Sequence, residues 1–139
     1  MALRNLSADV SNRFAAIVVN SLDSRPLAQS ARMLLTAGSR VANTNMKWND
    51  ARSRLAQQGE SPSLIEPVSG TVVLRNLQGA VAVTAAALDG AGRPIGEPIP
   101  AKKTAEGWAL AIGDPVTTWY AVSVQRPAAA RAGSPSSGK

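Results

Sequence analysis

The residues best suited to bind a ligand lie in one short stretch, Asn43 to Asn49. It places the large indole of Trp48 among side chains that donate and accept hydrogen bonds, those of Asn43, Thr44, Asn45 and Asn49. Two interpretations follow. Either this is a surface that binds a polar ligand, or it is a loop held by its own hydrogen bonds around a Trp that closes one end of the fold.

Carbohydrate is the ligand class that this composition favours. Sugars present C–H faces that stack on aromatic rings, and their hydroxyl groups need polar partners. Trp119 is a second candidate ring, because Tyr120, Val122 and Val124 point to one side of their strand and leave Trp119 on the other. The predicted ligand-binding residues are therefore Trp48, Asn43, Asn45, Asn49, Lys47 and Trp119.

The other aromatic residues are better explained as core. Trp108 is in phase with Leu110 and Ile112 in an alternating segment, and Tyr120 shares its face with Val122 and Val124. Both side chains are therefore expected to lie inside the protein.

Catalysis finds little support in the sequence. The chain contains no His and no Cys, which excludes a Ser/His/Asp triad and a zinc site built on imidazole or thiolate. Most of its nine acidic residues sit at turns, without the pairing that glycoside hydrolysis requires. We predict no catalytic residue, no metal ligand and no cofactor, and leave open a structural calcium ion bound by turn oxygens.

Charge and hydropathy limit the partners. The net charge is +6, but the basic residues are scattered and no run exceeds Lys102-Lys103, so nucleic acid is not expected. No apolar stretch approaches the roughly 20 residues that a membrane-spanning helix needs.

Short alternating or β-branched segments separated by turn signals predict an all-β fold. A length of 139 residues suits one domain. We predict an immunoglobulin-like or jelly-roll-like β-sandwich of about 7–8 antiparallel strands. The expected divisions are a lead-in over residues 1–12, the sandwich over 13–126, and a disordered tail or linker over 127–139.

Three local expectations follow from the same patterns. The segment Arg13 to Leu22 is apolar on both faces, which predicts a central strand covered on each side. Residues 63–68 and 71–76 are read as two strands flanking the turn Ser69-Gly70. Residues 49–62 are polar and predict a long loop, with a short helix over 50–58 as the alternative.

Several segments, in order, resemble one family. They are Ser21–Ser30, Ala31–Ala37, Asn43–Asn49, Leu64–Val72 and Thr118–Tyr120. Together they are similar to the C-terminal β-sandwich domains that follow a (β/α)-barrel catalytic domain in large bacterial glycoside hydrolases, and the likeness covers about Arg13 to Gln125. These domains usually have Gly where this chain has Asn45, a residue that tolerates a left-handed backbone.

The resemblance implies a non-catalytic accessory module of a secreted polysaccharide-degrading enzyme, located outside the cell or in the periplasm. Its expected partners are a polysaccharide or oligosaccharide of β-glucan or xylan type and the upstream catalytic domain of the same polypeptide. The alternative is a purely structural domain that braces the barrel and binds no sugar.

Overall fold

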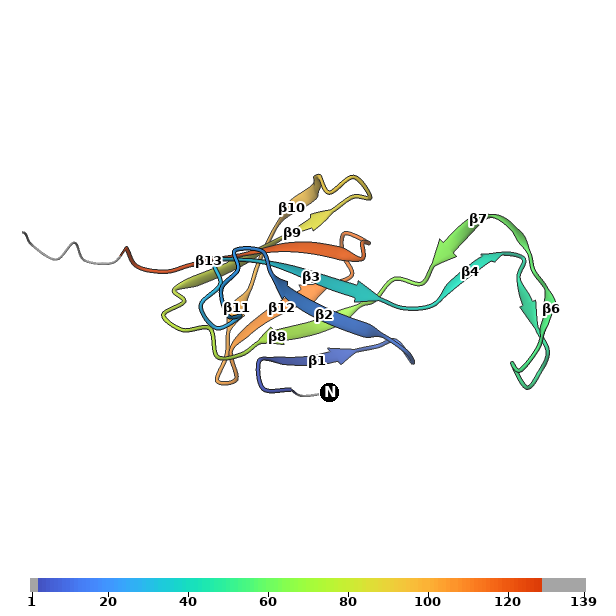
Figure 1. The fold of residues 1–139 in the computed structure, drawn as a ribbon, viewed down its shortest axis with the longest axis horizontal. Helices are drawn as coiled ribbons and strands as arrows, with labels where there is room; N and C mark the ends of the chain where they lie inside the picture. The colour runs from blue at the N-terminus through green and yellow to red at the C-terminus, as the bar shows by residue number, and fades with distance from the viewer. Residues whose placement is uncertain (1–2, 129–139) are drawn as a thin grey trace, which may run out of the picture.

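The computed structural model describes residues 3–128 and is all-β (Figure 1). Its strands are β1 (Leu6–Val10), β2 (Ala16–Ser21), β3 (Arg32–Gly38), β4 (Val41–Thr44), β5 (Lys47–Trp48), β6 (Leu55–Gln57), β7 (Glu60–Ile65), β8 (Gly70–Leu74), β9 (Ala82–Leu88), β10 (Pro94–Pro100), β11 (Lys102–Lys103), β12 (Trp108–Ile112) and β13 (Trp119–Gln125).

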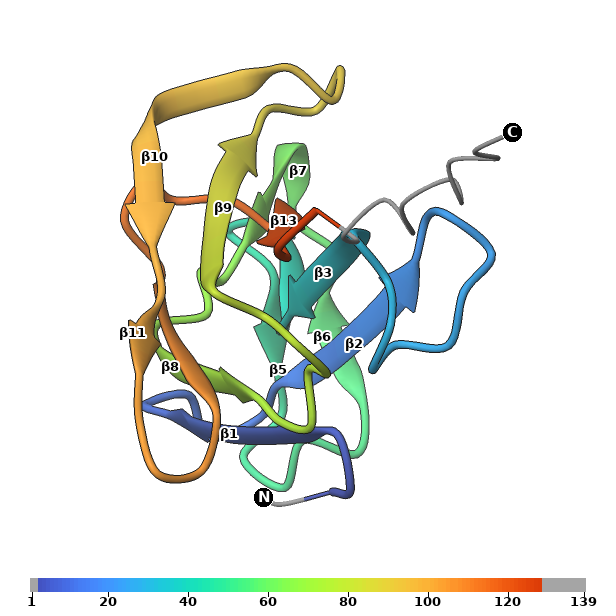
Figure 2. The same cartoon turned by 90° about the vertical axis from the view of Figure 1, so that its left-hand side faces the viewer.

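Two antiparallel sheets form the body of the molecule. One has the order β1-β8-β12-β11 and the other the order β10-β9-β13-β3-β2. Seen along the long axis, the two sheets cover each other (Figure 2). The predicted sandwich is confirmed, although the strands are shorter and more numerous than expected.

Alternation along the strands builds the core between these sheets. Met33, Leu35 and Ala37 of β3 are buried, as are Val72 and Leu74 of β8 and the alternate residues of β9, β12 and β13. Their neighbours in sequence point outward. A period of two therefore gives each sheet one apolar face, and the two faces bury each other.

Two aromatic residues predicted for the core are found there. Tyr120 is fully buried, and its hydroxyl accepts a hydrogen bond from the Gly113 N–H at 2.9 Å. Burial raises the pKa of this phenol, so the group stays protonated. Trp108 is also buried, with the Lys103 ammonium 5.0 Å from its ring centre in a cation–π contact.

The strand predicted to be central, within Arg13 to Leu22, lies at the edge of its sheet. β2 pairs with β3 on one side only and ends the five-stranded sheet. Its alternate residues Ile17 and Val19 pack against the core, whereas Val18 is exposed. The prediction of a central strand was wrong, because apolar residues on both faces also occur in a strand whose outer face is left uncovered.

The amino-terminal and Ser69-Gly70 regions also differ from expectation. The lead-in predicted for residues 1–12 contains β1, which pairs with β8. Residues on either side of Ser69-Gly70 do not pair with each other: β7 pairs with β4, and β8 pairs with β1 and β12. The predicted tail over 127–139 lies largely outside the described residues.

Residues 41–65 form an arm that projects from one end of the sandwich (Figure 1). Within it β4 pairs with β7 and β5 pairs with β6, so the predicted long loop over 49–62 holds strands and a turn, and the alternative helix over 50–58 is absent from it. A hydrogen bond from the Glu66 N–H to the Arg40 carbonyl, 2.9 Å long, closes its base.

A carboxylate at the far end of the sandwich ties the loop between β2 and β3. Asp23 accepts hydrogen bonds from the Ala31 N–H (2.7 Å) and from the hydroxyls of Ser30 and Ser21 (2.8 Å each). These bonds, that from Ala31 first, hold the pKa of Asp23 well below its usual range. The charged form therefore stabilises the fold.

Asp23→Asn should lower stability at neutral pH, because the amide cannot accept hydrogen bonds through both of its terminal atoms. Because the pKa of Asp23 is lower in the folded than in the unfolded chain, its charge stabilises the native state above about pH 4, the unfolded pKa. This stabilisation is lost as the pH falls through the folded pKa. In urea unfolding from pH 7 to pH 2, the difference in free energy of unfolding between wild type and variant should therefore narrow below about pH 4. A gap independent of pH would contradict this role.

The arm should be dispensable for folding of the sandwich. Val41 and Ile65 are cross-strand partners at its base, so an Asn-Gly turn can replace residues 42–64 and join them. Because residues 41–65 include no buried side chain, the melting temperature should change by less than about 4 °C, the effect of roughly 1 kcal/mol in a domain of this size. A variant that fails to fold would show that the arm supports the core.

Candidate functional site

The end of the arm is organised by one amide side chain. The Asn49 side-chain oxygen accepts hydrogen bonds from the backbone N–H groups of Ser53 (2.9 Å) and Arg54 (3.0 Å), and its amide nitrogen donates to the Ser53 hydroxyl at 3.1 Å. The Arg52 N–H also donates to the Asn49 carbonyl. Asn49 thus folds the turn between β5 and β6 back on itself.

The middle of the arm is held in the same way. Asn43 donates to the Gln58 carbonyl at 3.2 Å and accepts from the Ser63 hydroxyl at 2.8 Å. Asn45 has a left-handed backbone (φ 61°), as its residue type allows, and donates to the Glu60 carboxylate at 3.0 Å. The amides predicted to contact a sugar therefore bind the arm itself, which matches the hydrogen-bonded-loop interpretation of this stretch.

One glycine is required where these strands come together. Gly59 has a φ of +75°, and a Cβ atom there would overlap the backbone of Thr44 and Met46 on the opposite strand. Gly at this position lets the two sides of the ribbon approach closely where it passes from the β4–β7 pair to the β5–β6 pair.

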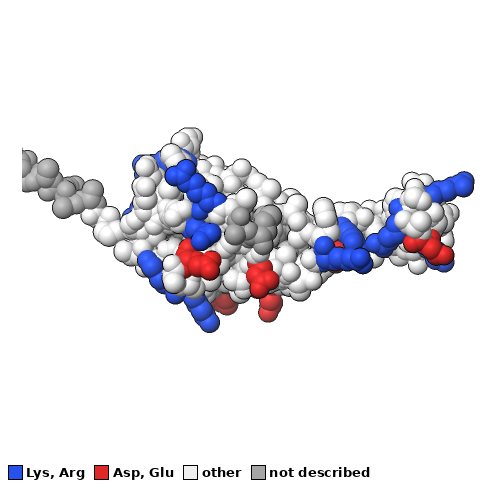
Figure 3. Space-filling model, turned by 90° about the horizontal axis from the view of Figure 1, so that it is seen from below, with Lys and Arg blue, Asp and Glu red and all other residues white. Residues whose placement is uncertain are grey.

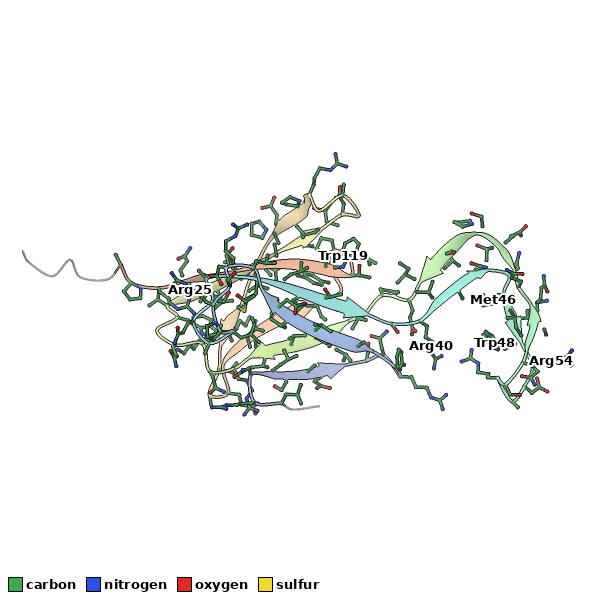
Figure 4. All side chains as sticks on the ribbon, viewed as in Figure 1. Arg25, Arg40, Met46, Trp48, Arg54 and Trp119 are labelled. Atoms are coloured by element: carbon green, nitrogen blue, oxygen red, sulfur yellow. The ribbon has the colours of Figure 1, made fainter. Side chains whose placement is uncertain are left out.

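Trp48 is not sealed inside the protein. It is 46% exposed and lies in the outer part of the arm, close to Met46 (Figure 4). Its cross-strand partner Leu55 is 39% exposed, so the two apolar side chains share one face of the ribbon. Trp48 also lines an open hollow of about 360 Å³ with Arg40, Val41, Ala42, Met46 and Arg52.

Trp119 lies elsewhere, on the sandwich (Figure 4). It is 38% exposed, as the alternation of its strand predicts, and lines a separate, mostly apolar hollow of about 460 Å³. Ile65 at the base of the arm and Val116 line the same hollow. The structure therefore places the Asn residues, Lys47 and Trp48 in one arm, but neither Lys47 nor any of these Asn residues lines the hollow beside Trp48, and Trp119 lies apart from them.

Sequence reasoning missed most of the apolar surface of the arm. Besides Trp48, its large exposed apolar residues are Val41, Leu55, Leu64 and Ile65. Val41 and Ile65 face each other on one side of the ribbon, and Leu64 lies on the other. The sequence does distinguish these residues, since they occur in a stretch otherwise rich in Asn, Ser, Arg and Gln. The sequence patterns, however, assign them only to a strand or a loop and not to an exposed surface.

Charges of both signs accompany this apolar surface. Basic side chains lie along the arm with acidic ones near its outer end (Figure 3). They are Arg40 at its base, Lys47, Arg52 and Arg54, against Asp50 and Glu60. Such mixed charge suits a protein surface better than a uniform polyanion.

The described residues show neither a cluster of metal ligands nor a membrane-spanning element. Among residues 3–128, no three acidic side chains come together to hold a metal ion. No helix in this part of the chain could cross a membrane.

Comparisons with known proteins gave no match, whether with family models, with curated proteins or with solved structures.

Asn49→Ala should loosen the end of the arm without affecting the sandwich. It removes three hydrogen bonds that hold residues 49–54, all of them far from the core. Trypsin should then cut faster after Arg52 and Arg54, while the melting temperature stays within about 4 °C of wild type. Equal cleavage rates in the two proteins would show that Asn49 does not control this turn.

Proposed function

We propose that the chain is a non-catalytic accessory module whose arm binds a neighbouring protein domain. One observation carries the proposal: residues 41–65 include no buried side chain and expose five large apolar ones. A two-stranded ribbon alone is marginally stable in water, and grouped apolar side chains on a surface commonly mark a contact. A partner surface would cover these side chains and hold the ribbon in place.

The resemblance in sequence suggests what that partner is. It favours the (β/α)-barrel catalytic domain of a secreted glycoside hydrolase, joined to this module in one polypeptide. Apolar residues on both faces of the arm support its insertion between partner surfaces, as a brace requires. Mixed charges around them would supply polar contacts at the rim.

Photo-cross-linking from the arm tests this function. Benzoylphenylalanine at Leu55 or Leu64, in cells that naturally make the protein, should give a covalent adduct with one defined protein domain, because both side chains are exposed in the arm. The matched control is Val81, an apolar residue on the sandwich that is at least as exposed as either probe position. Absence of an adduct from the arm, or equal adducts from Val81, would contradict the proposal.

Glycan binding at Trp48 is the second candidate. It is supported by the half-exposed indole in an open hollow beside Arg40 and Arg52, since an indole face can stack on a sugar and guanidinium groups can donate to its hydroxyls. Asn43, Asn45 and Asn49 would then position the ring instead of contacting the sugar.

Affinity electrophoresis separates the two candidates. If glycan binding is correct, gels containing β-glucan or xylan should retard the wild type, and Trp48→Ala should remove the retardation, because the variant lacks the ring on which the sugar would stack. Trp119→Ala serves as the control for a second exposed indole. Equal mobility of wild type and Trp48→Ala in every polysaccharide would exclude glycan binding and leave the protein-binding proposal intact.

A further inference from the structure

The free edge of β2 presents unpaired backbone groups. Leu22 donates its N–H to the Arg32 carbonyl of the neighbouring strand. In an antiparallel pair the bonded residues alternate, so Val18 and Asn20 also bond toward β3. The N–H and C=O groups of Ile17 and Val19 therefore point away from the sheet, where no strand of the described chain pairs with them.

This edge lacks the features that usually prevent pairing with another chain. From Phe14 to Leu22 the sequence FAAIVVNSL contains no charged residue and no Pro. The other edges of the two sandwich sheets do carry such features: β10 has Pro94, Pro98 and Pro100 with a bulge, β11 consists of Lys102-Lys103, and β1 contains Asp9.

An apolar groove lies beside the same edge. It has a volume of about 350 Å³ and lies between residues 3–6, which lead into β1, and residues 17–19 of β2. Leu6, Ile17, Val19 and Leu27 are among the residues that line it. A strand added at β2 would place alternate side chains over this groove.

We propose that the added strand is β2 of a second copy of this chain, paired antiparallel about a twofold axis at Val18. The outward backbone groups of Ile17 then bond those of the partner's Val19, and the reverse, while Val18 faces the partner's Val18. The two five-stranded sheets become one continuous sheet. Such an isologous contact closes with two copies.

This register pairs β2 with itself and groups its exposed apolar side chains. Opposite residues are those whose numbers sum to 36, which places Ala16 beside the partner's Asn20 and, just beyond the ends of β2, Phe14 beside the partner's Leu22. Phe14, Val18 and Leu22 are 56%, 48% and 52% exposed in the single chain and would cover one another.

The inner face of the register fits the groove as well. In each copy Ile17 and Val19 point toward the groove, and the pairing places Ile17 beside the partner's Val19 and Val19 beside the partner's Ile17. Two apolar layers would thus become continuous across the axis. A shift by one residue in either strand would set inner-face side chains beside outer-face ones and would lose the Val18–Val18 contact.

A disulfide at the axis tests the geometry directly, because the chain has no other Cys. Val18 and its partner form a non-hydrogen-bonded pair, whose Cα atoms lie about 4.5 Å apart, within the range that a disulfide spans. Val18→Cys should form a covalent dimer under mild oxidation. Val81→Cys, at a comparably exposed valine, should remain monomeric under the same conditions.

Sedimentation equilibrium tests the contact without a cross-link. The wild type should dimerise as concentration rises. Val18→Lys should raise the dissociation constant about tenfold or more, because it places two ammonium groups opposite each other, whereas Val81→Lys should not. Circular dichroism checks that each variant is folded.

Three results would overturn the proposal: a wild type that stays monomeric at every concentration, a dimer that Val18→Lys leaves unchanged, or equal cross-linking of Val18→Cys and Val81→Cys. Replacing residues 42–64 by Asn-Gly should leave the dimer intact. This separates the proposal from binding by the arm, since each of the two can fail alone.

Discussion

Mutual burial of one face of each sheet is the constraint on which the structure depends. The buried apolar residues of the described chain lie between the two sheets, and Leu35, Val72, Leu110 and Tyr120 are removed almost wholly from water. Burial of this kind is the main favourable contribution to folding. Segments that do not contribute to it, the arm above all, are free to serve contacts with other molecules.

Much of this core could be predicted from the sequence. In the strands that contain Leu35, Val72, Trp108 and Tyr120, apolar and other residues alternate cleanly, and a period of two specifies both the strand and its buried face. The strand at Pro94–Pro100 was missed, because Pro and Gly within a segment argue against a strand. It lies at a sheet edge and is bulged, where such residues are tolerated.

The position of β2 and the course of the arm could not be predicted in the same way. Whether a strand is central or at an edge depends on which strands pair, and the residue types of β2 do not show which strands pair with it. The stretch from Asn43 to Asn49 was identified as unusual, but its amides could bind a ligand or the backbone equally well by type. Only the folded path of the arm shows that Asn43 and Asn49 bond its backbone and that Asn45 bonds the Glu60 carboxylate.

The hydrogen bond between Arg40 and Glu66 has a consequence for how such proteins can diverge. The chain leaves the sandwich and returns to it at neighbouring positions, so changes in length between these residues need not disturb the rest of the fold. Side chains alternate between the two faces of the ribbon along each of the paired strands. Only inserts that add two residues to each strand therefore keep the remaining side chains on their original faces. Homologous chains should therefore differ by steps of this size between residues 41 and 65, while the sheets stay constant.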